Sequence, residues 1–266
     1  MSEAVFKDVS VTIGEEIVWQ PLPNKGLSNR LYRGYLAGQP MILRIEAGQD
    51  LAFGCDRARE RAVLSVLADF HWSPDVVAIS NGDSSCGWML MEDAGEVARV
   101  LSGHGKEQLL AALSEWQRIS VSNLPEFDFK LLWLEYQRVF NQLKAPHKLS
   151  KQLEQCQSYF AQLPSLPSTL THHDLHPGNL CWREDQLTVL DWEYAGLSNP
   201  LLDADSLHRN CAIDIADLHL LPAFQSLSYC QLLEGICVAE NFNRALEQLW
   251  FSVRDLIVKR NKQAAT

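Results

Sequence analysis

The segment that most constrains this chain is a polar loop, residues 172–179, followed at once by a short hairpin-like pattern. The loop reads His-His-Asp-Leu-His-Pro-Gly-Asn. After it, two apolar-rich runs, Leu180–Arg183 and Leu187–Asp191, flank the polar residues 184–186. This pattern predicts two antiparallel strands joined by a turn. Folding the hairpin about Asp185 places the last loop residue opposite the last residue of the second run.

That register places Asn179 opposite Asp191, with Asp174 just upstream. Phosphoryl transfer from ATP needs a carboxylate to accept the proton of the attacking hydroxyl, and oxygen ligands that hold Mg²⁺ against the phosphates. Asp174 supplies the first, and Asn179 and Asp191 supply the second, in the order that kinases use. An ordinary polar loop is disfavoured, because loop, spacing and second Asp must all coincide. The pattern indicates a kinase-type active site.

A zinc site is the other chemistry that crowded His and Asp residues suggest. Catalytic zinc uses three protein ligands in fixed geometry. The cluster lacks the His-Glu-x-x-His spacing, and no Cys-x-x-Cys pair occurs in the sequence. Adjacent His residues also point in different directions along an extended loop. We therefore favour the kinase interpretation over zinc.

Bulk properties agree with a cytoplasmic enzyme. The 266 residues are 47% hydrophobic and carry mixed charges, so the chain can bury a sizeable core. No apolar run is long enough to span a bilayer, no signal peptide is evident, and the seven scattered cysteines read as reduced thiols. A net charge of −10 argues against nucleic acid as a partner and mildly favours a cationic substrate. Monomer and homodimer both remain open.

The first ninety residues have strand character interrupted by one helix. The β-like runs are Ile17–Leu22, Arg30–Leu36, Met41–Glu46, Val76–Ile79 and Trp88–Met91. Asp56 caps a predicted helix that runs to about Phe70. From about Ala94 onward helical apolar stripes dominate, over residues 109–116, 132–143, 149–160 and 242–256, with a further helix from Pro200 to Asn210. We expect an α+β, two-lobed, protein-kinase-like fold: a small antiparallel-sheet lobe with one helix over 1–92, and a larger, mainly helical lobe over 93–266.

The motifs resemble those of the aminoglycoside phosphotransferase and choline kinase superfamily, and the run that begins at Asp191 is most similar to bacterial choline kinase-like and thiamine kinase-like members. The resemblance extends over nearly the full chain, with its specific motifs in residues 172–203. It implies that Asp174 is the catalytic base and that Asn179 and Asp191 bind Mg²⁺. It implies further that His172 packs and hydrogen-bonds to hold the loop. His176 and Asp203 match structural positions that steady the site.

The resemblance also assigns roles in the small lobe. Ser28 and Asn29 belong to a short loop that covers the nucleotide phosphates, although a plain turn fits Gly26–Asn29 equally well. Arg44 stands where protein kinases place a phosphate-contacting Lys, and Glu60 on the following helix would pair with it. Solvated surface charges are the bland alternative for both, because three Arg residues surround Glu60. The hinge that binds adenine through its backbone is assigned to Met91 and Glu92.

The resemblance implies a small cationic alcohol of the choline, ethanolamine or thiamine class as the substrate. Such cations bind aromatic faces and carboxylates, which Trp192 and Glu193 would offer next to Asp191. The alternatives are an aminoglycoside phosphotransferase, a nucleotide-binding pseudokinase scaffold and a kinase of protein side chains. The last two are disfavoured, because all three chemical positions are filled and only eight residues separate Asp191 from Pro200. ATP with Mg²⁺ is the expected donor, and GTP remains open.

Overall fold

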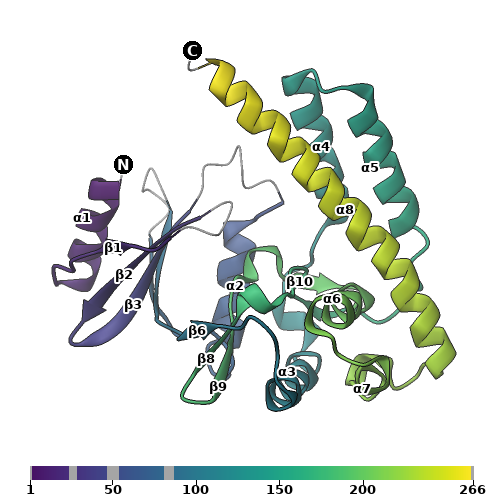
Figure 1. Cartoon of the computed structure of the whole chain (residues 1–266), viewed down its shortest axis with the longest axis horizontal. Helices are drawn as coiled ribbons and strands as arrows, with labels where there is room; N and C mark the ends of the chain where they lie inside the picture. Colours follow the sequence, from purple (N-terminus) through teal and green to yellow (C-terminus); the bar gives the residue numbers. More distant parts are fainter. Residues whose placement is uncertain (1, 24–28, 47–53, 81–86, 265–266) are drawn as a thin grey trace.

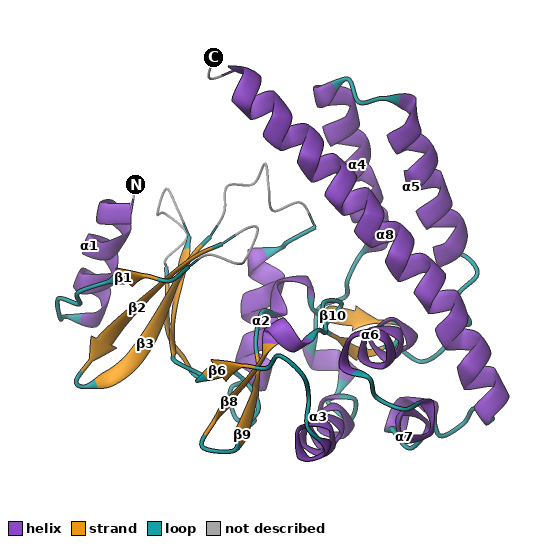
Figure 2. Ribbon diagram, viewed as in Figure 1, coloured by secondary structure: helices purple, strands orange, loops and turns teal. Residues whose placement is uncertain are grey.

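The computed structural model describes residues 2–23, 29–46, 54–80 and 87–264, with side chains up to residue 260. It confirms the α+β class. A five-stranded sheet forms one lobe and helices dominate the other (Figure 1; Figure 2). The sheet has the order β1-β2-β3-β5-β4, and every neighbouring pair is antiparallel. Its strands are β1 (Gln20–Pro21), β2 (Arg30–Leu36), β3 (Gln39–Ile45), β4 (Val76–Ile79) and β5 (Trp88–Glu92). The lobe boundary at residue 92 remains a prediction.

A helix absent from the expected fold, α1 (Ser2–Ile13), covers the outer face of this sheet (Figure 2). Side chains alternate along a strand, so β3 buries Leu43 against α1 and turns Arg44 to the opposite face. Val5 and Val9 of α1 pack into the same apolar cluster as Leu43. The expectation of one helix in this lobe was therefore wrong. The sheet needs a cover on its second face, and α1 supplies it.

The helix that was expected, α2 (Arg57–Leu67), lies between the sheet and the helical lobe (Figure 1). The carboxylate of Asp56 caps it by accepting the backbone N–H groups of Ala58 and Arg59. Helix α2 buries Val63, Leu64 and Leu67, and it also buries one charged residue, Glu60. Burial of a carboxylate on an otherwise apolar face requires a partner, which the site supplies.

Helices and short turns build the larger lobe around one continuous apolar core. The helices are α3 (Gly103–Trp116), α4 (Phe129–Leu143), α5 (His147–Phe160), α6 (Leu201–Cys211), α7 (Ile215–His219) and α8 (Tyr229–Ala264). The 3₁₀ turns are η1 (Val121–Asn123), η2 (Pro177–Asn179), η3 (Trp192–Tyr194) and η4 (Pro222–Phe224). The long helix α8 packs along both α5 and α6 (Figure 1). All five predicted helical segments of this lobe are confirmed.

Two small antiparallel sheets hold the loop that the sequence singled out. Strands β8 (Leu180–Arg183) and β9 (Gln186–Val189) form the predicted hairpin, and β6 (Glu96–Val97) adds to its edge. Strand β7 (Thr169–Thr171) pairs with β10 (Gly196–Ser198), which follows η3 directly. The loop between β7 and β8 is thereby fixed at both ends, next to the segment between β9 and β10.

Candidate active site

The polar loop after β7 is fastened to helix α6 by one carboxylate. Asp203, in the first turn of α6 and 2% exposed, accepts the backbone N–H of His172 at 2.7 Å and that of His173 at 2.9 Å. Burial raises the pKa of Asp203 to about 7, although both hydrogen bonds favour its charged form. His173 has a φ of 67°, in the left-handed region, so this anchor holds an uncommon backbone conformation. The residue that follows is Asp174, whose backbone position depends on this anchor.

His172 joins the loop to the hairpin. Its ring is fully buried, its Nε2 lies 2.8 Å from the carbonyl oxygen of Leu190, and its Nδ1 accepts the backbone N–H of Asp174 at 3.3 Å. These partners assign the proton to Nε2. Burial lowers the pKa of His172, which keeps the ring neutral. His172 therefore has the contacts of a residue that holds the loop, as the resemblance implies.

Asp174 itself faces an open region, with its side chain 42% exposed. Asn179 Nδ2 donates to the Asp174 carbonyl at 2.9 Å and to its carboxylate Oδ2 at 3.2 Å. His176 Nδ1 caps η2 by accepting the Gly178 N–H, and its Nε2 lies 3.6 Å from Asp174 Oδ2. The hydrogen bond with Asp174 raises the pKa of His176. The carboxylate is thus oriented by Asn179 and His176 while remaining accessible.

The hairpin differs from its predicted register by one residue. Leu180 pairs with Val189, and the Leu190 N–H donates to the Asn179 carbonyl at 2.8 Å, so Asn179 stands opposite Leu190 and not opposite Asp191. The turn contains two residues, 184 and 185, both with positive φ, which is the backbone of a type I′ hairpin turn. The expected turn of three residues was therefore wrong. Asn179 and Asp191 still lie at the same end of the hairpin.

Asp191 begins the segment after β9 in the left-handed conformation, with a φ of 63°. Its carboxylate Oδ1 accepts from Arg44 Nη1 at 3.3 Å, and Arg44 Nη2 donates to Glu60 Oε2 at 2.7 Å. The side chains of Arg44 and Glu60 are 6% and 2% exposed, so the expected strand-to-helix ion pair is present and buried. Burial and Glu193 raise the pKa of Asp191 to about 7, against the opposing effect of Arg44. Asp174 also raises that pKa, so its negative charge acts on Asp191.

The two residues after Asp191 do not offer the expected substrate surface. Trp192 is 1% exposed, packs against Trp72 and Trp116, and donates its Nε1–H to the Val189 carbonyl. Glu193 is 4% exposed, and its Oε2 already accepts from two protein donors. The structure thus corrects both substrate assignments, because a buried ring has no free face and a buried, paired carboxylate cannot receive a ligand cation without losing its partners.

The residues that the resemblance assigns to the nucleotide differ in whether they could face a ligand. Ser28 lies outside the described residues. Asn29 is buried, and its side chain bonds with Glu193 and with Arg57, so it faces the protein and not an open cleft. At the hinge, the Glu92 N–H donates to the Asp75 carbonyl at 2.9 Å. Met91 lies inside β5, where it pairs with both β3 and β4.

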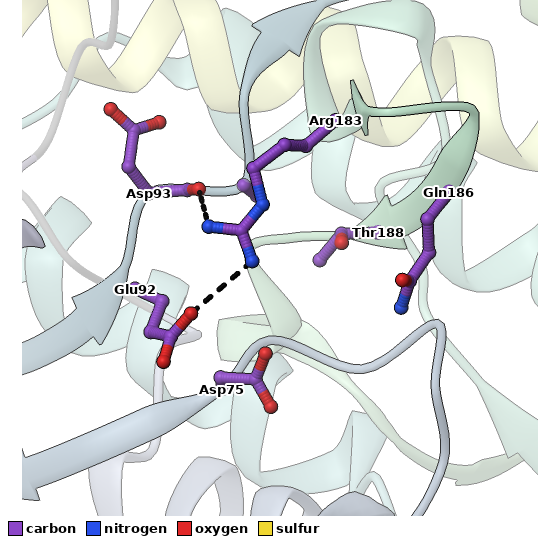
Figure 3. Close-up of a pocket in the computed structure, with 7 residues that line it drawn as sticks. Asp75, Glu92, Asp93, Arg183, Gln186 and Thr188 are labelled. Carbon is purple, nitrogen blue, oxygen red and sulfur yellow. Dashed lines mark hydrogen bonds and ion pairs between the residues drawn. The ribbon is translucent and has the colours of Figure 1, made fainter. Parts of the chain in front are cut away.

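A clamp from the hairpin secures this hinge. Figure 3 shows Arg183, at the end of β8, reaching the carbonyl of Asp93 at 3.0 Å and the carboxylate of Glu92 at 3.2 Å. Asp75, Gln186 and Thr188 complete a small polar pocket around it. The residues that line this pocket include none of the catalytic loop. The hairpin therefore carries Asn179 at one end and holds the hinge near the other.

Sequence reasoning missed Arg57 and Arg59 at the start of α2, which it treated only as surrounding charge. Arg57 Nη1 donates to Glu193 Oε2 at 2.8 Å and to Glu60 Oε2 at 3.0 Å. Arg59 Nε donates to the Ala195 carbonyl at 3.0 Å. The spacing of three residues between Arg57 and Glu60 on a predicted helix was a usable signal. No signal in the sequence pointed to the other partner of Arg57, Glu193, which is 136 residues away along the chain.

The donor set fits Mg²⁺ and a polyphosphate. Asn179 directs its Nδ2 at Asp174, and the carboxylate of Asp191 is 35% exposed and has Arg44 as its ion-pair partner among the described residues. Mg²⁺ prefers such oxygen ligands and commonly takes one or two carboxylates plus phosphate oxygens. Within the described part of the chain, no group of three His, Cys, Asp or Glu side chains is arranged to hold a metal. Arg44 Nε is buried without a hydrogen-bond partner there, so the guanidinium has donor capacity that its two ion pairs leave unused.

Comparison with known proteins agrees with this geometry. No helix in the described residues combines the length and apolarity needed to cross a membrane. No curated protein matches the chain. Among solved structures, the choline kinase LicA from Streptococcus pneumoniae has a TM-score of 0.65 at 17% identity, covering 100% of this chain and 97% of that one. A choline/ethanolamine kinase family protein from Mesorhizobium loti has a TM-score of 0.64 at 20% identity, covering 100% and 87%.

The GDP complex of wild-type aminoglycoside 2'-phosphotransferase-IIIa has a TM-score of 0.64 at 14% identity, covering 99% of each chain. These likenesses establish the kinase-like fold. The model of the phosphotransferase enzyme family matches residues 19–227, which is most of the sequence. The chain therefore belongs to the phosphotransferase enzyme family and is a small-molecule phosphotransferase.

Proposed function

We propose that this enzyme transfers the γ-phosphoryl group of ATP to the hydroxyl of a small cationic metabolite of the choline, ethanolamine or thiamine type. The observation that carries the proposal is that two groups of side chains lie at the same end of the hairpin. One is the oriented carboxylate of Asp174 with Asn179, and the other is the buried Arg44–Glu60 pair in contact with Asp191. Phosphoryl transfer needs a proton acceptor beside a site for metal and phosphate, and these two units supply them.

In this proposal each residue acts through contacts that the structure contains. Asp174 accepts the proton of the attacking hydroxyl, and Asn179 and His176 keep its carboxylate turned toward the open side. Arg44 binds the phosphates with the guanidinium edge that now contacts Asp191, and Glu60 holds its other edge. Asn179 and Asp191 would hold Mg²⁺, which neutralises phosphate charge when bound. The hinge assignment narrows to the carbonyl of Glu92, because its N–H is already bonded to Asp75.

Charge supports a cationic acceptor. The net charge of −10 attracts cations to the molecule, and the choline kinases among the structural neighbours have the same fold over the full chain. The nucleotide is proposed as ATP by the same likeness. Neighbouring structures contain GDP in one case and AMP-PNP in another, so both nucleotides belong in the test.

An aminoglycoside acceptor is the second candidate, and one observation favours it. Glu247 of α8 is 53% exposed and pairs with Arg209, and after the larger effect of Asp174 its charge also contributes to the raised pKa of His176, so an accessible carboxylate lies within electrostatic range of the loop that carries Asp174. Aminoglycosides carry several ammonium groups, which suit accessible carboxylates more than aromatic faces. Trp192, the aromatic residue directly after Asp191, is buried and offers no free face.

The test is a coupled ADP-release assay with Mg²⁺ and either ATP or GTP, run against choline, ethanolamine, thiamine and kanamycin side by side. We expect acceptor-dependent release with one of the first three, and kanamycin turnover would favour the second candidate. The matched control is Asp174→Asn, which keeps the side-chain shape but cannot take up the proton. Its turnover should fall by about 10²–10⁴-fold. Binding of nucleotide without turnover of any acceptor would instead support a scaffold.

A further inference from the structure

Six charged or amide side chains form a continuous chain of contacts behind the phosphate site. In order they are Asp191, Arg44, Glu60, Arg57, Glu193 and Asn29. Negative and positive groups alternate along the first five. Asp191 and Glu193 belong to the same short segment. The series of side-chain contacts therefore forms a closed ring, which the backbone at residue 192 completes. The two guanidinium groups thus connect α2 to this segment by two separate routes.

Arg57 is the member with the most partners. Its guanidinium reaches Glu193 Oε2 at 2.8 Å, Glu60 Oε2 at 3.0 Å, Asn29 Oδ1 at 3.2 Å and Glu46 Oε2 at 3.5 Å. Its side chain is 19% exposed, and the carboxylates of Glu60 and Glu193 are 2% and 5% exposed. At such burial an unpaired carboxylate is costly, so these acids depend on Arg57 for charge balance.

Binding of a nucleotide would change one contact in this series of side chains while the others must stay in place. Arg44 holds Glu60 through Nη2 and Asp191 through Nη1, so phosphates and a metal would separate Arg44 from Asp191. During that exchange Glu60 must stay in place to hold Arg44, and Asp191 must stay aimed at the site. Arg57 contacts the same Oε2 of Glu60 that Arg44 uses, and it also holds Glu193, two residues after Asp191. It therefore steadies both partners from behind.

We propose that Arg57 is a positioning residue for phosphoryl transfer, which fixes Glu60 and the segment after Asp191 so that Arg44 can exchange Asp191 for the nucleotide phosphates. Asn29, which also binds Glu193 Oε2 at 3.1 Å, extends the same link to the start of β2. The inference rests on the proposed function. It adds a residue that touches neither substrate nor metal.

The test uses conservative variants, since Arg57→Ala leaves two buried carboxylates short of a cation. Arg57→Lys keeps the charge but cannot bridge several acceptors, and Glu193→Gln keeps the shape but removes the charge. The control is Arg61→Ala on the same helix, because Arg61 makes no ion pair among the described residues. Calorimetry would measure the binding of Mg²⁺ with a non-hydrolysable ATP analogue, and steady-state kinetics would give kcat and both KM values.

For Arg57→Lys and Glu193→Gln we expect analogue binding about 3- to 30-fold weaker and a lower kcat/KM for ATP, with the acceptor KM changed less than about twofold. The double variant should lose about as much as the worse single variant, because both break one link. Arg61→Ala should match the wild type. A purely stabilising role would lower Tm while leaving analogue binding and kcat intact.

The two possible failures can be told apart. Wild-type protein that binds no Mg²⁺–nucleotide would refute the proposed function and this inference with it. If the wild type binds the Mg²⁺–nucleotide analogue and both conservative variants bind it equally well, the role of Arg57 is refuted while the proposed function stands. Strictly additive losses in the double variant would also overturn it, because independent effects would then replace the shared link.

Discussion

Asp203 gives the sharpest prediction, because one buried carboxylate holds two backbone N–H groups next to Asp174, the proposed base. In Asp203→Asn the side chain keeps its size but offers one oxygen, so either the His172 or the His173 N–H loses its acceptor. At pH 5 the Asp203 carboxyl is protonated, since its pKa is raised to about 7, but its hydroxyl oxygen can still accept an N–H, whereas the NH₂ group of Asn cannot. A buried polar group left unsatisfied costs about 1–3 kcal/mol. We expect Asp203→Asn to lower the free energy of unfolding by about that amount at pH 5.

The effect should depend on pH with a defined sign. Burial raises the pKa of Asp203 to about 7 in the folded protein, against an ordinary value of 3.8. An acid with a raised folded pKa favours folding at low pH, and that contribution is lost as pH rises toward and through 7. Between pH 5 and pH 8 the wild type should lose about 2–3 kcal/mol from this group, and the Asn variant should lose none. The stability gap between the two proteins should therefore close as pH rises.

Urea unfolding of both proteins at pH 5, 6.5 and 8 measures the difference between their free energies of unfolding. The kcat of both proteins at pH 8 reports whether the loop still holds Asp174 in position. Because His173 and Asp174 depend on this anchor, we expect kcat of Asp203→Asn to fall about 10-fold or more even where its stability matches the wild type. Asp205, two residues further along α6, is a matched control for kcat, since it bonds with Asn243 and not with the loop after β7. A gap that stays constant or widens from pH 5 to pH 8 would refute this account of Asp203.

Three further predictions address the metal site, the ion pair and the hairpin. Asp191→Ala should abolish Mg²⁺-dependent turnover while the protein stays folded, at a small cost in Tm because Ala is strained at the positive φ of this position; unchanged turnover with the same metal requirement would contradict its assignment. Glu60→Gln should lower kcat/KM for ATP about 10- to 100-fold, as Arg44 loses its charged partner, while the acceptor KM stays constant in the same titrations. Glu184→Asn combined with Asp185→Gly should raise Tm by about 1–4 °C in calorimetry, because both positions have positive φ; a lower Tm would argue against the two-residue turn.

The elements carried by local signals were predictable from the sequence. The alternation of β2 and β3, the Asp56 cap of α2 and the hairpin after the polar loop all depend on neighbours within a few residues. The predicted hairpin register was wrong by one residue. The turn length depends on positive φ angles at Glu184 and Asp185, which the acidic side chains at these positions do not predict. Helix α1 was missed although its apolar residues recur at helical spacing, since a start rich in polar residues obscured the stripe.

The parts of the site that could not be predicted depend on contacts between distant segments. Glu193 was expected at the substrate because it follows Asp191, yet its partners Asn29 and Arg57 are 164 and 136 residues away along the chain. Trp192 was expected to face a cation, but Trp72 and Trp116 enclose it. A single sequence gives the identity of a charged or aromatic residue, and only the fold decides whether that residue faces a ligand or another part of the protein.

The contacts of the segment after Asp191 explain how this site forms without a long activation segment. Strand β10 pairs with β7 within a few residues of Asp191, and Pro200 is the N-cap residue of α6, which carries Asp203 back to the loop after β7. On the other side, Arg57 and Arg59 fasten α2 to the same short segment. The proposed base, the proposed metal ligand Asp191 and Arg44 are therefore all positioned by contacts with one stretch of chain, residues 191–203. The ion pair of Arg44 with Glu60 is formed in the ligand-free protein, so nucleotide binding has only to displace the contact between Arg44 and Asp191.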